Sequence, residues 1–103
     1  MQKISFKEQN TEEVLRRLKN REDVVVLDIR EPKEWATEHI PGAKHIPLGE
    51  IPYHLQEFNS NKETIVVCRS GNRSGNRSGK ACELLHAKRY NVVNMKGGMR
   101  VDG

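Results

Sequence analysis

The stretch ETIVVCRSGNRSGNRSGKACELL, residues 63–85, contains the change of pattern that decides the fold. Its first five residues, ETIVV, contain a run of β-branched residues, which is typical of a strand buried on both faces. A basic segment rich in glycine and serine follows, and it contains the letters NRSG twice. The last residues place Ala81, Leu84 and Leu85 on one face of a helix. A strand, a loop and a helix in this order predict one βα unit of a parallel sheet.

The rest of the chain continues this alternation. NTEEVLRRLKN opens with a capping-box pattern from Asn10 to Glu13 and predicts a helix over residues 11–19. DVVVLDI and NVVNM predict two more buried strands, and AKHIPL a short one. EPKEWATEH has Pro32 in a first-turn position and predicts a short helix, while EIPYHLQEF has apolar residues at helical spacing. Together these elements predict a single α/β domain over residues 1–103, with a mostly parallel central sheet and helices on both faces.

Length and composition exclude several classes of protein. The 103 residues suit one domain with a modest core. No apolar run approaches the roughly 18 residues of a membrane span, and the first residues lack the apolar region of a secretory signal. Two cysteines cannot form a tetrahedral zinc site alone, and no histidine lies at a ligand-like spacing from them. We therefore expect a reducing, cytoplasmic location with free thiols, and no metal site.

The formal net charge of +4 has two interpretations, an ordinary basic surface or an anionic substrate. Most lysines and arginines are interleaved with glutamates, so there is no basic stripe suited to nucleic acid. One region has no carboxylate among its basic residues, which are Arg69, Arg73, Arg77 and Lys80. We expect a small anionic substrate, and neither a nucleic acid nor a membrane as a partner.

The two cysteines have different surroundings. Cys68 follows a buried strand, and ligands bind at the carboxyl ends of strands in open α/β sheets. A glycine-rich loop before a helix N-terminus can form a nest of backbone N–H groups, which would lower the pKa of the Cys68 thiol and make it a nucleophile. The competing interpretation, a small buried side chain, leaves the arginine-rich loop unexplained. Cys82 lies within an apolar helical pattern and is predicted to be a buried structural thiol; the alternative is a resolving thiol that forms a disulfide with Cys68.

With these residues in place, the sequence resembles the rhodanese-like family in its single-domain form. Three segments carry the resemblance. LDIREPKEWATEHIPGAKHIP, residues 27–47, contains an Asp-x-Arg, an acidic–aromatic pair and His-Ile-Pro-Gly-Ala. VVCRSGNRS, residues 66–74, matches the family's Cys-x4-Arg loop, and VVNMKGGM is similar to its last strand and Gly-Gly turn. Together they span most of residues 24–99.

The resemblance implies a sulfurtransferase whose Cys68 thiolate takes a sulfane sulfur from an anionic donor such as thiosulfate and holds it as a persulfide. Arg69 and Arg73 would bind the anionic end of the donor or stabilise the loop, and the backbone N–H groups of residues 69–73 would cradle the sulfur. A nucleophilic acceptor, cyanide or a thiol that a partner protein could carry, would then remove it. No metal or organic cofactor is required. The residues implied in substrate binding are Arg69, Ser70, Gly71, Asn72, Arg73, Arg77 and Arg30.

The first motif leaves two roles open for its charged pair. Asp28 and Arg30 either contact the substrate or form a salt-bridged scaffold near the strand end. His39 and His45 suggest a Cys–His base. We expect His39 to pack or cap within its motif instead, because the cradle already activates the thiol.

The repeated NRSG departs from the family pattern. Counted from Cys68, the expected loop arginine is Arg73; counted back from the apolar face of the helix, it is Arg77. Either the cradle is longer, near Cys-x8-Arg, or the helix begins one turn earlier. That turn would contain Asn, Ser and Gly, so local propensity favours the longer loop and a weakened transfer of sulfur. The resemblance also implies a final tryptophan-bearing helix. We expect that helix to be missing here, and one flank of the sheet to be less covered or covered by a partner.

Two other functions remain open. A cysteine-dependent phosphatase or arsenate reductase would need Cys-x5-Arg, but residue 74 is Ser; a remodelled loop reaching Arg77 would still admit a larger anion. A non-catalytic or sulfur-carrier module is the other alternative. Inactive relatives typically lack the loop cysteine, and this chain keeps it.

Overall fold

The computed structural model describes residues 7–59, 61–67 and 76–96, and for residues 76–79 and Lys96 it describes the backbone alone. Its centre is one five-stranded sheet in the order β1-β5-β4-β2-β3. All four neighbouring strand pairs are parallel, as the sequence predicts. The strands are β1 (Lys7–Asn10), β2 (Val24–Asp28), β3 (Lys44–His45), β4 (Glu63–Val67) and β5 (Val92–Lys96).

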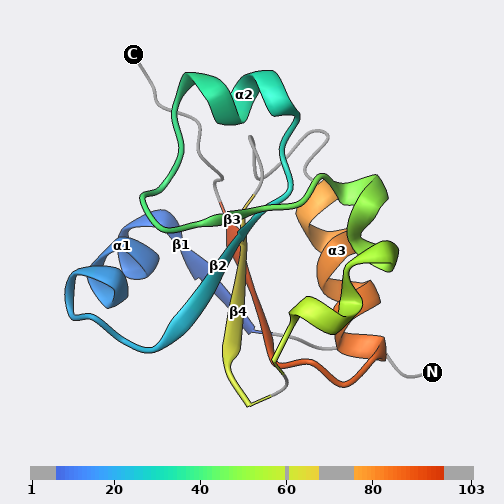
Figure 1. Ribbon diagram of the computed structural model, residues 1–103. Helices are drawn as coiled ribbons and strands as arrows, with labels where there is room; N and C mark the ends of the chain where they lie inside the picture. The colour runs from blue at the N-terminus through green and yellow to red at the C-terminus, as the bar shows by residue number, and fades with distance from the viewer. Residues whose placement is uncertain (1–6, 60, 68–75, 97–103) are drawn as a thin grey trace.

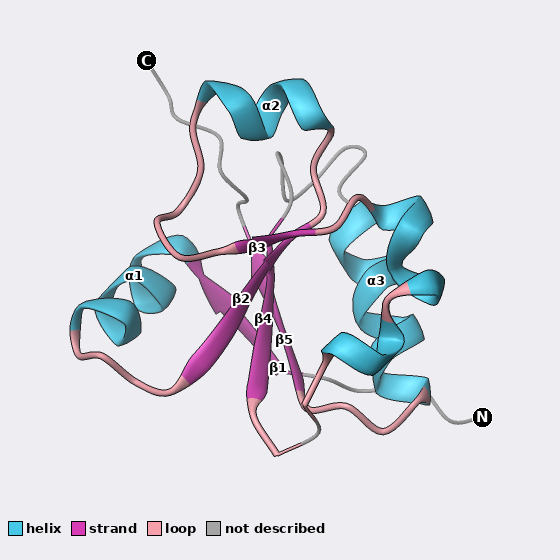
Figure 2. Cartoon of the chain, viewed as in Figure 1, coloured by secondary structure: helices cyan, strands magenta, loops and turns pink. Residues whose placement is uncertain are grey.

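Helices lie on both sides of this sheet (Figure 1). Helix α1 (Thr11–Lys19) covers one face and α3 (Asn76–Ala87) the other, where two 3-10 helices, η1 (Leu48–Tyr53) and η2 (Leu55–Glu57), also lie. The short α2 (Pro32–Thr37) lies across the edge at which β2 ends (Figure 2). The predicted α/β architecture, with a parallel sheet between helices, is therefore confirmed.

Side chains alternate between two buried clusters because successive residues of a strand point to opposite faces. On β4, Ile65 and Val67 belong to the cluster under α1, while Val66 belongs to the cluster under α3. Helix α3 contributes its apolar face to the second cluster through Ala81 and Leu85, and Leu84 is half-buried beside it. Every residue of β4 after Glu63 is buried, as expected for the central strand of the sheet.

Two elements differ from the sequence-based expectation. The strand β1 was not expected, because Lys-Glu-Gln-Asn has neither β-branched residues nor apolar alternation. It forms at the sheet edge by parallel pairing with β5, where one side is open to water and polar side chains are tolerated. The segment EIPYHLQEF forms η1 and η2 instead of an α-helix, and Pro52 within η1 lacks the N–H that a longer helix would need.

Within the described ranges, no helix has the length and apolar character needed to cross a membrane. The expectation of a missing final helix falls on residues 97–103, outside the described residues.

Candidate active site at the carboxyl edge of the sheet

The carboxyl ends of β2 and β4 lie side by side. Asp28 is the register partner of Val67, and the backbone N–H of Ile29 donates to the carbonyl oxygen of Val67 at 3.0 Å. Val67 is fully buried and directly precedes Cys68 in the chain. The strand that leads to the candidate nucleophile therefore ends where ligands bind in folds of this class.

Cys68, the predicted nucleophile, lies outside the described part of the chain. The same holds for most of the residues predicted to bind substrate, which are Arg69, Ser70, Gly71, Asn72 and Arg73. Arg77 lies in the first turn of α3, where the structure describes its backbone alone. The cradle around the thiol remains a prediction, and the structure describes the framework on either side of it.

The second NRSG copy is helical, because α3 begins at Asn76. The expectation from local propensity that these four residues belong to the loop is wrong. Once Ala81 and Leu85 anchor the helix on the sheet, each further residue adds a backbone hydrogen bond, and this offsets a propensity cost of about 1 kcal/mol for Gly79. Eight residues, 68–75, separate β4 from α3.

Asp28 and Arg30 form a buried, two-pronged ion pair at the end of β2. Nε of Arg30 donates to both carboxylate oxygens of Asp28, at 2.9 Å and 3.0 Å, and Nη2 donates to Oδ2 at 2.9 Å. The two residues are only 1% and 4% exposed. Such paired, hydrogen-bonded charges are the form in which ionised groups are tolerated in a protein interior.

Arg30 also joins this pair to α2. Its Nη2 donates to the carbonyl oxygen of Glu38, the residue that caps the C-terminus of α2. The sequence leaves two roles open for Arg30, a salt-bridged scaffold and a contact with substrate. The bonds to Asp28 and Glu38 are those of a scaffold. A contact with substrate remains a prediction.

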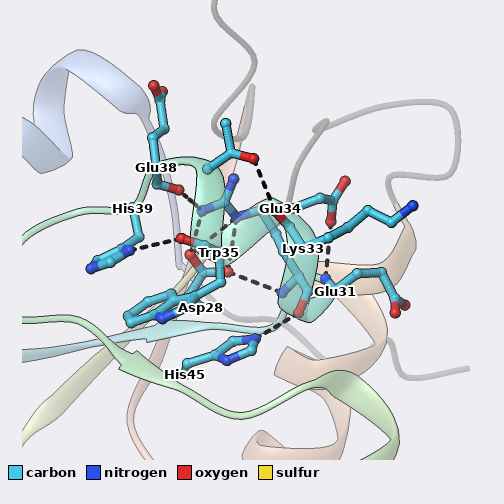
Figure 3. A network of polar contacts seen from close by, with 10 residues as sticks. Asp28, Glu31, Lys33, Glu34, Trp35, Glu38, His39 and His45 are labelled. Carbon is cyan, nitrogen blue, oxygen red and sulfur yellow. Dashed lines mark hydrogen bonds and ion pairs between the residues drawn. The ribbon is translucent and has the colours of Figure 1, made fainter.

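Two histidines and the single tryptophan form a stack beside the ion pair (Figure 3). The indole of Trp35 lies between the rings of His39 and His45, with centroid distances of 3.6 Å and 4.8 Å and nearly parallel planes. Nδ1 of His39 donates to the carbonyl oxygen of Trp35 at 2.9 Å, and Nε2 of His45 donates to that of Arg30 at 2.8 Å, since a carbonyl only accepts. The prediction that His39 packs within its motif is confirmed, and His45 is held in the same way.

Sequence reasoning missed three parts of this network: the carbonyl of Glu38, the stacking role of Trp35 and the bond from His45 to Arg30. The spacing of Trp35 and His39, one helical turn apart, was the available signal for the first stack. The contact of His45 with Arg30 depends on β3 pairing with β2, in which His45 is the partner of Asp28. That register cannot be predicted from the spacing of the residues along the chain.

Cys82 lies on the buried face of α3, in the cluster that includes Leu27 and Val66, and has no exposed surface. The prediction that its thiol is buried is confirmed.

Comparison with known proteins agrees with this architecture. Residues 10–101 match the model of the rhodanese-like domain. A sulfurtransferase of Allochromatium vinosum is 37% identical over 91 residues, which cover 87% of this chain and 81% of that protein. The thiosulfate sulfurtransferase GlpE of Pseudoalteromonas translucida is 33% identical over 81 residues, 79% of this chain and 74% of its own length. The crystal structure of a rhodanese-like domain protein from Staphylococcus aureus superposes with a TM-score of 0.83 at 37% identity, covering 91% of this chain and 88% of the other.

The domain model, the sulfurtransferases and the superposed structure each match most of the chain. The region that the domain model matches contains strands β2 to β5, the ion pair at the end of β2 and the strand that leads to Cys68. The chain belongs to the rhodanese-like family.

Proposed function

We propose that this protein is a sulfurtransferase that carries sulfane sulfur as a persulfide on Cys68, from an anionic, thiosulfate-like donor to a thiophilic acceptor. One structural observation supports it above the others: the strand that precedes Cys68 ends, fully buried, beside the Asp28–Arg30 motif at the carboxyl edge of the sheet. Membership of a family in which several relatives are named sulfurtransferases supports the same chemistry.

In the first half-reaction the Cys68 thiolate attacks the outer sulfur of thiosulfate. A sulfur–sulfur bond forms to Cys68, the sulfur–sulfur bond of thiosulfate breaks, and sulfite leaves with its electron pair. The backbone N–H groups of residues 69–73 stabilise the negative charge on the outer sulfur of the persulfide. Arg69, Arg73 and Arg77 supply positive charge for the donor, and Ser70, Gly71 and Asn72 complete the loop.

In the second half-reaction a nucleophile attacks the terminal sulfur of the persulfide. With cyanide, a carbon–sulfur bond forms, the persulfide bond breaks and its electrons return to the Cys68 thiolate, so that thiocyanate leaves. A thiol, free or on a partner protein, accepts sulfur in the same manner. This is double displacement through a covalent intermediate, and it uses no metal or organic cofactor. A reducing, cytoplasmic location would keep the Cys68 thiol available between cycles.

The test is formation of thiocyanate from thiosulfate and cyanide by the wild type and by the variants Cys68→Ser and Cys82→Ser. We expect turnover in the wild type, retention in Cys82→Ser, and loss in Cys68→Ser. Mass spectrometry after thiosulfate alone should show one added sulfur atom on the peptide that contains Cys68.

Three results would contradict the proposal or change it. Turnover that survives Cys68→Ser would remove Cys68 as the nucleophile. An added sulfur without turnover would favour the sulfur-carrier alternative. Hydrolysis of an aryl phosphate or reduction of arsenate, without thiocyanate formation, would favour a cysteine-dependent phosphatase or arsenate reductase.

A further inference from the structure

The backbone that enters the candidate site is fixed from the side of β2. The N–H of Ile29 donates to the carbonyl oxygen of Val67 at 3.0 Å. That carbonyl belongs to the peptide bond between Val67 and Cys68, and a peptide bond is planar. The position of Ile29 therefore limits the orientation of the peptide unit that leads into Cys68.

Ile29 is itself held from both sides of the chain. Its side chain is 1% exposed and packs in the cluster under α3. On one side, the carbonyl of Asp28 accepts from the N–H of Ile46 on the neighbouring segment at 3.0 Å. On the other side, the backbone N–H of Arg30 donates to Oδ1 of Asp28 at 3.0 Å. The ion pair thus closes a small ring of contacts around Ile29.

Two of the three guanidinium nitrogens of Arg30, Nε and Nη2, are bonded to the scaffold. Nε and Nη2 are hydrogen-bonded to Asp28, Nη2 also to the carbonyl of Glu38, and the side chain is only 5% exposed. The carbonyl of Arg30 accepts from Nε2 of His45. Figure 3 shows this network running from α2 through the ion pair to the stacked rings. An anion would have to displace these contacts before it could bind Nε or Nη2 of Arg30.

We infer that Arg30, together with Asp28, is a positioning residue for Cys68 and not a ligand of the sulfur donor. The ion pair holds Ile29, Ile29 holds the carbonyl of Val67, and that carbonyl orients the entry to the nucleophile. This inference rests on the proposed function, since Cys68 takes part in both half-reactions. A residue that positions Cys68 affects both of them, whereas a residue that binds thiosulfate affects the first alone.

The steady-state test compares Arg30→Lys with Arg17→Lys. Lysine keeps the charge of Arg30 but cannot form its two-pronged contact with Asp28. Arg17 is a matched control, because it pairs with Glu63 at the opposite end of β4. We expect Arg30→Lys to lower kcat/KM for thiosulfate and kcat/KM for cyanide by a similar factor of about ten. Arg17→Lys should change neither by more than about twofold. A fall in kcat/KM for thiosulfate alone would show that Arg30 binds the donor, and would overturn the inference.

Two measurements keep the inference separate from the proposed activity. Iodoacetamide is uncharged, so its rate of alkylation at Cys68, measured by peptide mapping across pH, reports on the thiol and not on anion binding. We expect Arg30→Lys to change this rate or its pH midpoint, and Arg17→Lys to leave both as in the wild type.

Hydrogen exchange of the Ile29 amide is the second measurement. It should become faster in Arg30→Lys by about tenfold, because the hydrogen bond from Ile29 to Val67 opens more often.

Unchanged alkylation and unchanged Ile29 exchange in Arg30→Lys would overturn the inference even if the wild type transfers no sulfur. Absence of thiocyanate in the wild type, with altered alkylation in the variant, would instead contradict the proposed function alone. If Arg30→Lys does not fold, Asp28→Asn replaces it: this variant keeps the size and hydrogen-bonding oxygen of Asp28 and removes its charge. The same outcomes apply to it.

Discussion

Arg17 and Glu63 join α1 to the first residue of β4: the guanidinium Nη2 of Arg17 donates to Oε1 of Glu63. The same guanidinium donates to Glu22 at 2.7 Å and to Gln9 at 2.8 Å. Burial alone would raise the pKa of Glu63, but the hydrogen bonds and charges of Arg17 and Lys7 together lower it below its ordinary value. The amino end of β4 is therefore held by an ion pair that is lost when Glu63 becomes protonated at acid pH.

Arg17→Leu is expected to lower the free energy of unfolding by about 1 kcal/mol at neutral pH. A carboxyl group whose pKa is lower in the folded state stabilises above its unfolded pKa, and this contribution is lost as the pH falls. The difference in free energy of unfolding between wild type and variant should therefore shrink as the pH falls below about 4.5, the ordinary pKa of a glutamate such as Glu63. Urea denaturation at neutral pH and at several acid pH values measures it.

The matched control for this prediction is Lys44→Met, which removes a pair with Glu57 that lies at the surface. It should leave the stability unchanged. If the loss of stability caused by Arg17→Leu stays constant across the acid range, the pair of Arg17 with Glu63 does not make the stability of the fold depend on pH.

Trp35→Leu is expected to destabilise the fold by about 2 kcal/mol, because it removes both ring stacks of the half-buried indole. Urea denaturation followed by circular dichroism measures the change. Tyr53→Leu is the control, since Tyr53 is 77% exposed and its loss should change stability by less than about 0.5 kcal/mol. Equal effects of the two substitutions would show that the stack adds nothing to stability.

In the variant Cys68→Ser, the remaining thiol of Cys82 should react with an aromatic disulfide reagent only when the protein opens. Cys82 is fully buried beneath α3, so we expect labelling to be about a thousandfold slower in native buffer than in denaturant. Absorbance of the released thiolate gives the rate. Labelling at the denatured rate in native buffer would mean that α3 detaches from the sheet far more often than its packing implies.

Deletion of one NRSG copy is expected to leave the fold intact and to raise kcat/KM for thiosulfate by about tenfold, because it brings Cys68 and the arginine in the first turn of α3 to the Cys-x4-Arg spacing of the family loop. The two copies are identical, so deleting residues 72–75 or 76–79 gives the same protein. Since α3 begins with an NRSG copy, the deletion shortens the segment between β4 and α3 and keeps the helix. Circular dichroism should show an unchanged helix content. Loss of activity with the fold retained would show that the long segment is required for the reaction.

Much of the fold could be predicted from local pattern. The helix Thr11–Lys19 follows from its capping box, and β2 and β4 follow from continuous β-branched runs that only a doubly covered sheet explains. The polar strand β1 could not be predicted in this way. Its stability comes from backbone pairing with β5, more than eighty residues away in the chain, and backbone pairing leaves no mark on side-chain composition.

The candidate site was predictable in its location but not in its framework. Cys68 is marked by the strand before it and the glycine-rich segment after it. The buried pair of Asp28 and Arg30 could be placed near the site, but its bond to Glu38 depends on where α2 ends. The second NRSG differs for the opposite reason: local propensity favours a loop there, but the anchoring of α3 on the sheet outweighs that propensity.

The position of Trp35 also gives the protein a built-in optical probe. It is the sole tryptophan of the chain, and its indole lies between two imidazoles. One of these, His45, is hydrogen-bonded to the backbone of Arg30 in the Asp28–Arg30 pair. The emission of Trp35 comes from one place, the junction of α2 with the carboxyl edge of the sheet. Loosening of that edge can therefore be followed on the unlabelled wild type, in real time, by the fluorescence of a single ring.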